Sequence, residues 1–329
     1  MGLLLALFFG FVPAFIYAGF VYWLDRFEKE PIKLLAGVFL WGALVAAGGA
    51  FIVNSLLELG VFYFTSSQSA ADLTTGSLIA PVIEESLKGA AVLIIFWTAH
   101  NEFDSVLDGI VYASITALGF AATENMFYIY TYGYVENGLG GIFVLAFIRN
   151  ILVGWQHPFY TAFIGIGLAK ARLSRRWLSK LAYVVFGWAA AIGLHSLHNT
   201  LSYFLDGSGG LLITTAVDWT GWLAMLIFII YMINREKQLL VRYLGEEVQF
   251  GTLFPQQFIT AISPSKQLHA RLSALVKRSY RNTSRFYQLC GEISHKKHQY
   301  LSLGDEDGNL AAIERLRTEL HQLSPWAYS

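Results

Sequence analysis

Long apolar runs alternate with short polar segments over the first 234 residues, which predicts an all-α, polytopic bundle of about seven transmembrane helices. The segments expected outside helices include a polar linker over 66–75, a glycine-rich loop over 132–140 and a tight loop over 206–210. We expect the spans at residues 2–24, 34–64, 76–99, 106–131, 141–171, 181–204 and 211–234.

The apolar stretch 141–171 is too long for a straight crossing. As one helix it would measure roughly 46 Å at 1.5 Å per residue, against a hydrocarbon core of about 30 Å. We therefore expect tilt, or a bend at Gly154 or Pro158.

Residues 235–329 contain no apolar run of membrane length but keep a helical spacing of apolar positions, as at Leu268, Leu272 and Leu275. This pattern predicts a small, soluble, helical C-terminal region. The expected organisation is thus a transmembrane domain over 1–234 and a cytoplasmic region over 235–329.

The distribution of basic residues predicts the orientation. Net charge is zero, yet residues 1–234 hold 10 Lys and Arg against 14 Asp and Glu, while residues 235–329 hold 13 against 9. The basic loops at 26–33 and 170–180, and the chain from Arg235 onward, should all be cytoplasmic. Seven crossings then place the N-terminus outside and the C-terminus inside, as in a multi-pass protein of a prokaryotic plasma membrane.

Composition narrows the chemistry further. The chain is 55% hydrophobic and carries a single cysteine, Cys290, which excludes an intrachain disulfide and a cysteine-rich metal site. The first apolar run has no basic region before it, so we expect a retained span and not a cleaved signal peptide. The lipid bilayer is an expected partner, and nucleic acid is not.

Glu84, Glu85 and Lys88 are the feature that the apolar background does not explain. They lie inside the expected span 76–99, and on a helix Lys88 is one turn from both acids. An ionisable residue at membrane depth costs at least about 2.5 kcal/mol, so such residues predict a functional site. The structural alternative is a buried ion pair that holds helices in register.

Other spans carry polar residues at comparable depth. Glu84 is 8 residues, about 12 Å, from the outer side, and His195 is 14 residues, about 21 Å, from the cytoplasmic side. Both positions fall in the outer half of the bilayer, so the polar residues can share one cavity open to that side. The remaining polar residues are Asp108, Glu124, Asn125, Arg149, Asn150, His157, His198 and Asn199.

Carboxylates and imidazoles together are suited to activating a water molecule. A glutamate can act as general base and then as general acid, or a Zn²⁺ held by histidine and glutamate can act as a Lewis acid. The metal candidates are Glu85, Glu124, His157 and His195, but the helical His-Glu-x-x-His motif is absent, so zinc and a metal-free mechanism both remain open.

Supporting roles are expected for the other polar groups. Lys88 should hold or tune one of the glutamates, and Arg149 should either contact a substrate carbonyl or pair with Asp108 or Glu124. We expect His198 to serve packing or support, and Asp108 to lie at the membrane interface.

Five short motifs, in order over about residues 20–200, resemble the PrsW family of intramembrane proteases, within the wider superfamily of CAAX-processing proteases. The first lies between the first two expected spans, and the others lie on or beside separate spans. They are Asp25-Arg26-Phe27-Glu28-Lys29-Glu30-Pro31, Glu84-Glu85-x-x-Lys88, Asp108-Gly109 leading to Gly119-Phe120-x-x-x-Glu124-Asn125, His157-Pro158-x-x-Thr161 and His195-x-x-x-Asn199.

The resemblance implies hydrolysis of a peptide bond in or beside the membrane. It implies that Glu84 and Glu85 supply the water-activating carboxylate, that His157 helps to hold the water, and that His195 and Asn199 stabilise the oxyanion or bind metal. Glu124 and Asn125 would line the same cavity. Some members cut membrane-anchored anti-sigma factors, so a membrane protein is the expected substrate.

Two alternatives use the same residues differently. Buried carboxylates and histidines also form proton relays in cation-coupled transporters, although no internal repeat is evident and seven spans do not divide evenly. A signalling or scaffold protein could hold the cluster for structure alone.

Overall fold

The computed structural model describes residues 1–205, 207–305 and 308–327. Over these residues every regular element is helical and none is a strand, which confirms the all-α class. The chain forms two compact units. The first comprises residues 1–22, 31–172 and 176–227, and the second comprises residues 23–30, 173–175 and 228–329.

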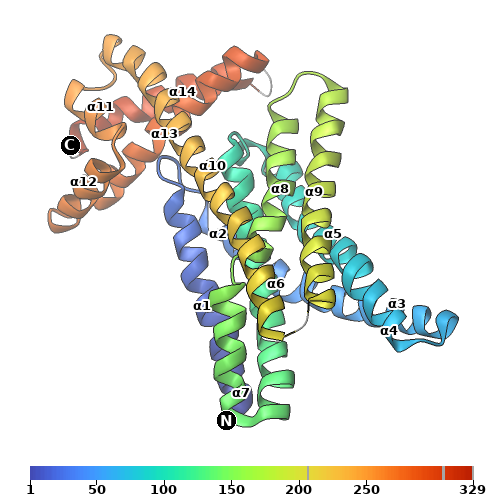
Figure 1. The fold of residues 1–329 in the computed structure, drawn as a ribbon. Helices are drawn as coiled ribbons and strands as arrows, with labels where there is room; N and C mark the ends of the chain where they lie inside the picture. The colour runs from blue at the N-terminus through green and yellow to red at the C-terminus, as the bar shows by residue number, and fades with distance from the viewer. Residues whose placement is uncertain (206, 306–307, 328–329) are drawn as a thin grey trace. The chain divides into compact units, whose positions relative to one another are not determined.

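Ten α-helices lie wholly or partly in the described residues of the first unit (Figure 1). They are α1 Gly2–Leu24, α2 Ile32–Leu40, α3 Ala47–Thr65, α4 Gln68–Thr74, α5 Ala80–Thr98, α6 Val106–Tyr128, α7 Glu136–Phe147, α8 Gln156–Arg172, α9 Trp177–Phe204 and α10 Gly207–Gln249.

Five helical stretches are long and apolar enough to cross a membrane, judged by length and composition. They are Gly2–Leu24, Ile32–Thr65, Val106–Arg172, Trp177–Phe204 and Gly207–Gln249. The third combines α6, α7 and α8, while α5, with its three ionisable residues, is not among the five. The protein is therefore a helical membrane protein, and the count of seven crossings stays a prediction.

The expected loops at 66–75 and 132–140 are mostly helical, contrary to the prediction. Gln68–Thr74 forms α4, and a π-helical segment over Ile129–Val135 runs directly into α7. Ser66 and Ser67 leave the helical conformation between α3 and α4, and within α7 Gly138 does so, with φ of 63° in a region that favours glycine. A continued helix forms the backbone hydrogen bonds that water cannot supply inside a membrane. Polar composition was therefore not enough to predict loops at these positions. Of the expected loop at 206–210, residue 206 is outside the described residues and the rest begins α10.

The long stretch 141–171 bends where expected. A π-helical segment over Ile148–Leu152 follows α7, and helical structure is interrupted at residues 153–155 before α8 begins at Gln156. The interruption includes Gly154, one of the two predicted bend positions.

Close backbone contact joins α6 to α8. A Cβ atom added to Gly109 would collide with the carbonyl oxygen of Gly165, and one added to Gly165 would collide with that of Gly109. Glycine at both positions lets the two helices approach at backbone distance, as small residues do in membrane bundles. At the start of α6, Ser105 and Asp108 form a capping box. Asp108 is therefore a helix cap.

The second unit has its own apolar core, formed by the end of α10 and by α11 Pro255–Ala261, α12 Pro264–Val276, α13 Tyr280–Leu303 and α14 Asn309–Leu323. Phe27, from the charged loop at 25–31, is 1% exposed and belongs to this core, as does Cys290. The side-chain amide of Gln288 accepts from Lys29 N at 2.9 Å and donates to Lys29 O at 3.1 Å. The loop is thus part of the second unit's packing.

Candidate functional site

A cavity of about 340 Å³ lies within the first unit, between helices α5, α6, α8 and α9. Its lining includes most of the polar residues that the sequence singled out: Glu84, Glu124, Arg149, His157, His195, His198 and Asn199. These residues, distant along the chain, lie around one space, whereas Glu85, Lys88 and Asn125, expected beside them, do not line it, and the catalytic roles stay a prediction.

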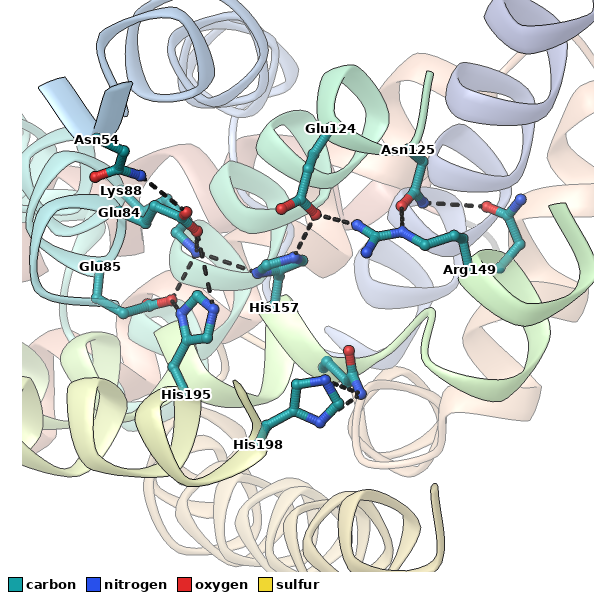
Figure 2. A network of polar contacts seen from close by, with 12 residues as sticks. Asn54, Glu84, Glu85, Lys88, Glu124, Asn125, Arg149, His157, His195 and His198 are labelled. Atoms are coloured by element: carbon teal, nitrogen blue, oxygen red, sulfur yellow. Dashed lines mark hydrogen bonds and ion pairs between the residues drawn. The ribbon is translucent and has the colours of Figure 1, made fainter. Parts of the chain in front are cut away.

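Glu85 is held on both carboxylate oxygens, and Figure 2 shows its contacts with Lys88 and His195. Its Oε1 accepts from Lys88 Nζ at 2.6 Å and from His195 Nδ1 at 2.9 Å, while its Oε2 accepts from Thr161 Oγ1 at 2.8 Å. The residue is fully buried and does not line the cavity. Glu85 therefore behaves as a fixed anion that orients its neighbours.

Glu84 presents a different face of the same helix. Its Oε1 accepts a long hydrogen bond of 3.4 Å from Asn54 on α3, while its Oε2 is buried without a hydrogen-bond partner among the described residues. That oxygen lies 3.9 Å from His195 Nε2 and 3.9 Å from Lys88 Nζ, and Glu84 lines the cavity. An unsatisfied buried carboxylate oxygen is costly, so this atom is the one prepared to receive a ligand.

The contact with Glu85 fixes the state of His195. A carboxylate accepts hydrogen bonds, so Nδ1 carries the proton and Nε2 is left as an acceptor facing Glu84. This arrangement matches the carboxylate partner that metal-bound histidines usually have on their second nitrogen. The same tautomer would also suit holding a water molecule.

His157 has both ring nitrogens engaged. Nε2 lies 2.9 Å from Glu124 Oε2, and Nδ1 lies 3.2 Å from Lys88 Nζ. The imidazole rings of His157 and His195 are 5.3 Å apart and nearly perpendicular. Lys88, fully buried, thus joins Glu85 to His157 and lies 4.2 Å above the Phe120 ring.

Glu124 and Arg149 form an ion pair at one side of the cavity (Figure 2). Arg149 Nε also donates to Asn125 Oδ1 at 2.7 Å, and its guanidinium lies 4.4 Å from the Tyr128 ring centroid. Of the two partners considered for Arg149, the structure pairs it with Glu124, while Asp108 caps α6.

Asn199 lines the cavity, but its Nδ2 donates to the carbonyl oxygen of Gly76 at 2.7 Å. His198 contacts Gln156 and Asp218, away from the glutamates. The position of His198 agrees with the expected supporting role and not with a direct role in the reaction.

The structure adds residues that motif reasoning missed: Asn54, Gln156, Tyr160 and Asp218. Asp218 could have been noticed as the one ionisable residue in the apolar span 211–234. Asn54, Gln156 and Tyr160 are ordinary in composition, and only their positions in the folded chain connect them to the site.

Three atoms could hold a metal ion. Glu84, His157 and His195 each offer one ligand atom, all within 4.8 Å of one another. One carboxylate and two imidazoles are a donor set found at catalytic zinc sites. The other sequence candidates, Glu85 and Glu124, are outside this group.

The family model described as PrsW family intramembrane metalloprotease matches residues 30–233. The chain is 28% identical over 196 residues to Protease PrsW of Geobacillus kaustophilus, covering 60% of this chain and 77% of that protein. Two further relatives, both Protease PrsW, are 29% identical. The one from Oceanobacillus iheyensis covers 58% of this chain and 79% of its own length, and the one from Bacillus subtilis 52% and 72%. No solved structure matches the chain.

Proposed function

Because the chain belongs to the PrsW family of intramembrane proteases, we propose that its polar cavity is the hydrolytic site and that Glu84 is the water-activating carboxylate. The observation that carries this assignment is the free, buried Oε2 of Glu84 at the cavity wall. Glu85, one residue away, has both oxygens engaged in hydrogen bonds and does not line the cavity.

Hydrolysis then follows from the positions of these groups. A water molecule between Glu84 Oε2 and His195 Nε2 gives a proton to the carboxylate while its oxygen attacks the substrate's carbonyl carbon. When the C–N bond breaks, Glu84 returns that proton to the leaving nitrogen. Asn199 has a second amide hydrogen besides the one donated to Gly76, and we assign it to the developing oxyanion.

The residues present also fit a metal ion, in agreement with the family's description as metalloproteases. Glu84 and His195 would be the first ligands, because each has a free atom facing the same space. His157 would be the third after one ring nitrogen leaves Lys88 or Glu124. A zinc ion bound there would supply Lewis-acid activation of water. With a metal bound, Glu84 would hold the ion that activates the water; without one, its Oε2 takes the proton itself.

The substrate we propose is a membrane-anchored regulatory protein of the anti-sigma-factor type, cut in the outer half of the bilayer. Support comes from the depth of Glu84 and His195 along their helices and from the basic loops, which favour an outside N-terminus and a cytoplasmic C-terminus. Reporter fusions at the two termini test this orientation, and a cytoplasmic N-terminus would contradict it.

The direct test compares Glu84→Gln with Glu85→Gln in the full chain in liposomes, using quenched fluorescent peptides with apolar transmembrane segments. Asp72→Asn is the matched control, because Asp72 lines the same cavity without a proposed role. Glu84→Gln should abolish cleavage with the melting temperature unchanged, whereas Glu85→Gln should also lower stability. Wild-type cleavage rates in Glu84→Gln would overturn the assignment.

Metal content is measured on the same proteins. A bound metal should be present in wild type and Asp72→Asn, and should be lost in Glu84→Gln and His195→Ala. Full activity of a protein shown to be free of metal would instead support the metal-free mechanism.

A further inference from the structure

Asp218 on α10 is a buried carboxylate that none of the motifs includes. It is 8% exposed and is the one ionisable residue between residues 207 and 234 of this apolar helix. A buried charge of this kind is tolerated where hydrogen-bond donors surround it. Asp218 should therefore have hydrogen-bond donors around it.

Three donors from two other helices meet this carboxylate. Tyr160 OH donates to Oδ1 at 3.1 Å, His198 Nδ1 lies 2.9 Å from Oδ2, and Gln156 Nε2 also donates to Oδ2. Gln156 and Tyr160 lie one turn apart on α8, and His198 is on α9. Asp218 therefore ties α8 and α9 to α10 at one point.

The tied residues contact the catalytic histidines. The Tyr160 ring stacks on the His195 imidazole, with centroids 5.2 Å apart and planes inclined by 21°. Gln156 directly precedes His157, and the His157 ring lies edge-on to Tyr160 at 6.5 Å. His195 and His157 are thus both in contact with Tyr160, whose hydroxyl donates to Asp218.

Asp218 itself does not line the catalytic cavity, whereas Gln156, Tyr160 and His198 do. It cannot reach the reacting atoms, so any effect on the reaction passes through those three side chains. The Tyr160 stack is the most direct route, because it sets the plane in which His195 Nε2 faces Glu84.

We infer that Asp218 is a positioning residue for catalysis: through Tyr160 and Gln156 it holds the imidazoles of His195 and His157 in their working orientation. This inference rests on the proposed function for its effect on rate, but the orientation itself can be measured without cleavage. A hydrogen bond to a buried carboxylate is worth more than a neutral one, so its loss should be measurable.

The first experiment measures kcat and KM of the full chain in liposomes, with a quenched fluorescent transmembrane peptide. Asp218→Asn and Tyr160→Phe should each lower kcat roughly tenfold, the size of one charge-assisted hydrogen bond, with little change in KM. Tyr160→Phe keeps the ring and removes only the hydroxyl. The double variant should be no worse than Asp218→Asn alone, because that substitution already weakens the one hydrogen bond that Tyr160→Phe removes.

Thr220→Ala is the control on the same helix, since its exposed hydroxyl bonds only to Ala216 O of α10. A purely structural Asp218 would lower the melting temperature and leave kcat of the folded protein within twofold of wild type. That result, or additive losses in the double variant, would overturn the inference.

A second readout does not need cleavage. Diethyl pyrocarbonate modifies unprotonated imidazoles, and mass spectrometry assigns the rate to each histidine. His195 should react several-fold faster in Asp218→Asn and in Tyr160→Phe alike, while exposed His269 on α12 serves as internal standard. Unchanged His195 reactivity in both variants would refute the inference even if no peptide is cleaved. Absence of cleavage by wild type across all peptides would count against the proposed function alone.

Discussion

Thr161→Val tests whether Glu85 is an orienting anion. The substitution is nearly isosteric and removes only the hydroxyl that donates to Glu85 Oε2 at 2.8 Å, between two side chains that are both fully buried. Oε2 would be left without its donor, while Lys88 and His195 would still hold Oε1. Hydrogen bonds to charged groups contribute about 1.5–3 kcal/mol, so we expect the free energy of unfolding to fall by about 2 kcal/mol.

The assay is reversible unfolding in mixed micelles, followed by cleavage kinetics on the folded protein. Thr116→Val is the matched control: Thr116 is equally buried, but its hydroxyl bonds to Tyr112 O of its own helix, so the loss should stay below about 1 kcal/mol. Thr161→Val should also be non-additive with Glu85→Gln. Equal losses for the two threonine variants, or full additivity, would refute the view of Glu85 as a fixed anion.

Two further predictions concern Arg149 at the cavity and Gln288 in the second unit. Arg149→Lys should lower cleavage roughly tenfold in the peptide assay, because an ammonium cannot bond Glu124 and Asn125 together as the guanidinium fork does; wild-type rates would contradict this. Gln288→Ala should speed maleimide labelling of Cys290, followed by mass spectrometry, about thirtyfold, because two hydrogen bonds of the Gln288 side-chain amide, worth about 1 kcal/mol each, are lost. Cys290 is fully buried and burial raises the pKa of its thiol, so unchanged labelling would show that the loop does not protect it.

The helical class and the approach of Glu84 to His195 could be predicted from sequence, because both depend on patterns that repeat along the chain, but Glu85, Lys88 and Asn125, expected at the same cavity, do not line it. Apolar runs of membrane length set the helices, and depth along each helix indicated that Glu84 and His195 could meet. The family resemblance is confirmed by the match over residues 30–233.

The division of labour between Glu84 and Glu85 could not be predicted. Adjacent residues on a helix point about 100° apart, and which one faces Thr161 or the cavity depends on packing by other helices. Asp218 was missed for a related reason, because its partners Gln156 and Tyr160 are ordinary residues until α8 and α10 are placed together. The loop at 25–31 carried a recognisable motif, yet its packing against α13 in the second unit was not foreseen.

The reciprocal glycine contact between α6 and α8 has a mechanical consequence. The backbones of α6 and α8 touch at Gly109 and Gly165, and no side chain lies between them at this point that could change its rotamer. The two helices should therefore move together as one rigid frame, which carries Glu124 and His157. A second reciprocal contact, between Gly167 of α8 and Gly187 of α9, adds α9 and its His195 to this frame, whereas Glu84 sits on α5. A displacement of α5 relative to the frame would separate Glu84 Oε2 from His195 Nε2, the two atoms assigned to the reacting water. Hydrolysis should therefore require α5 to stay docked against the frame.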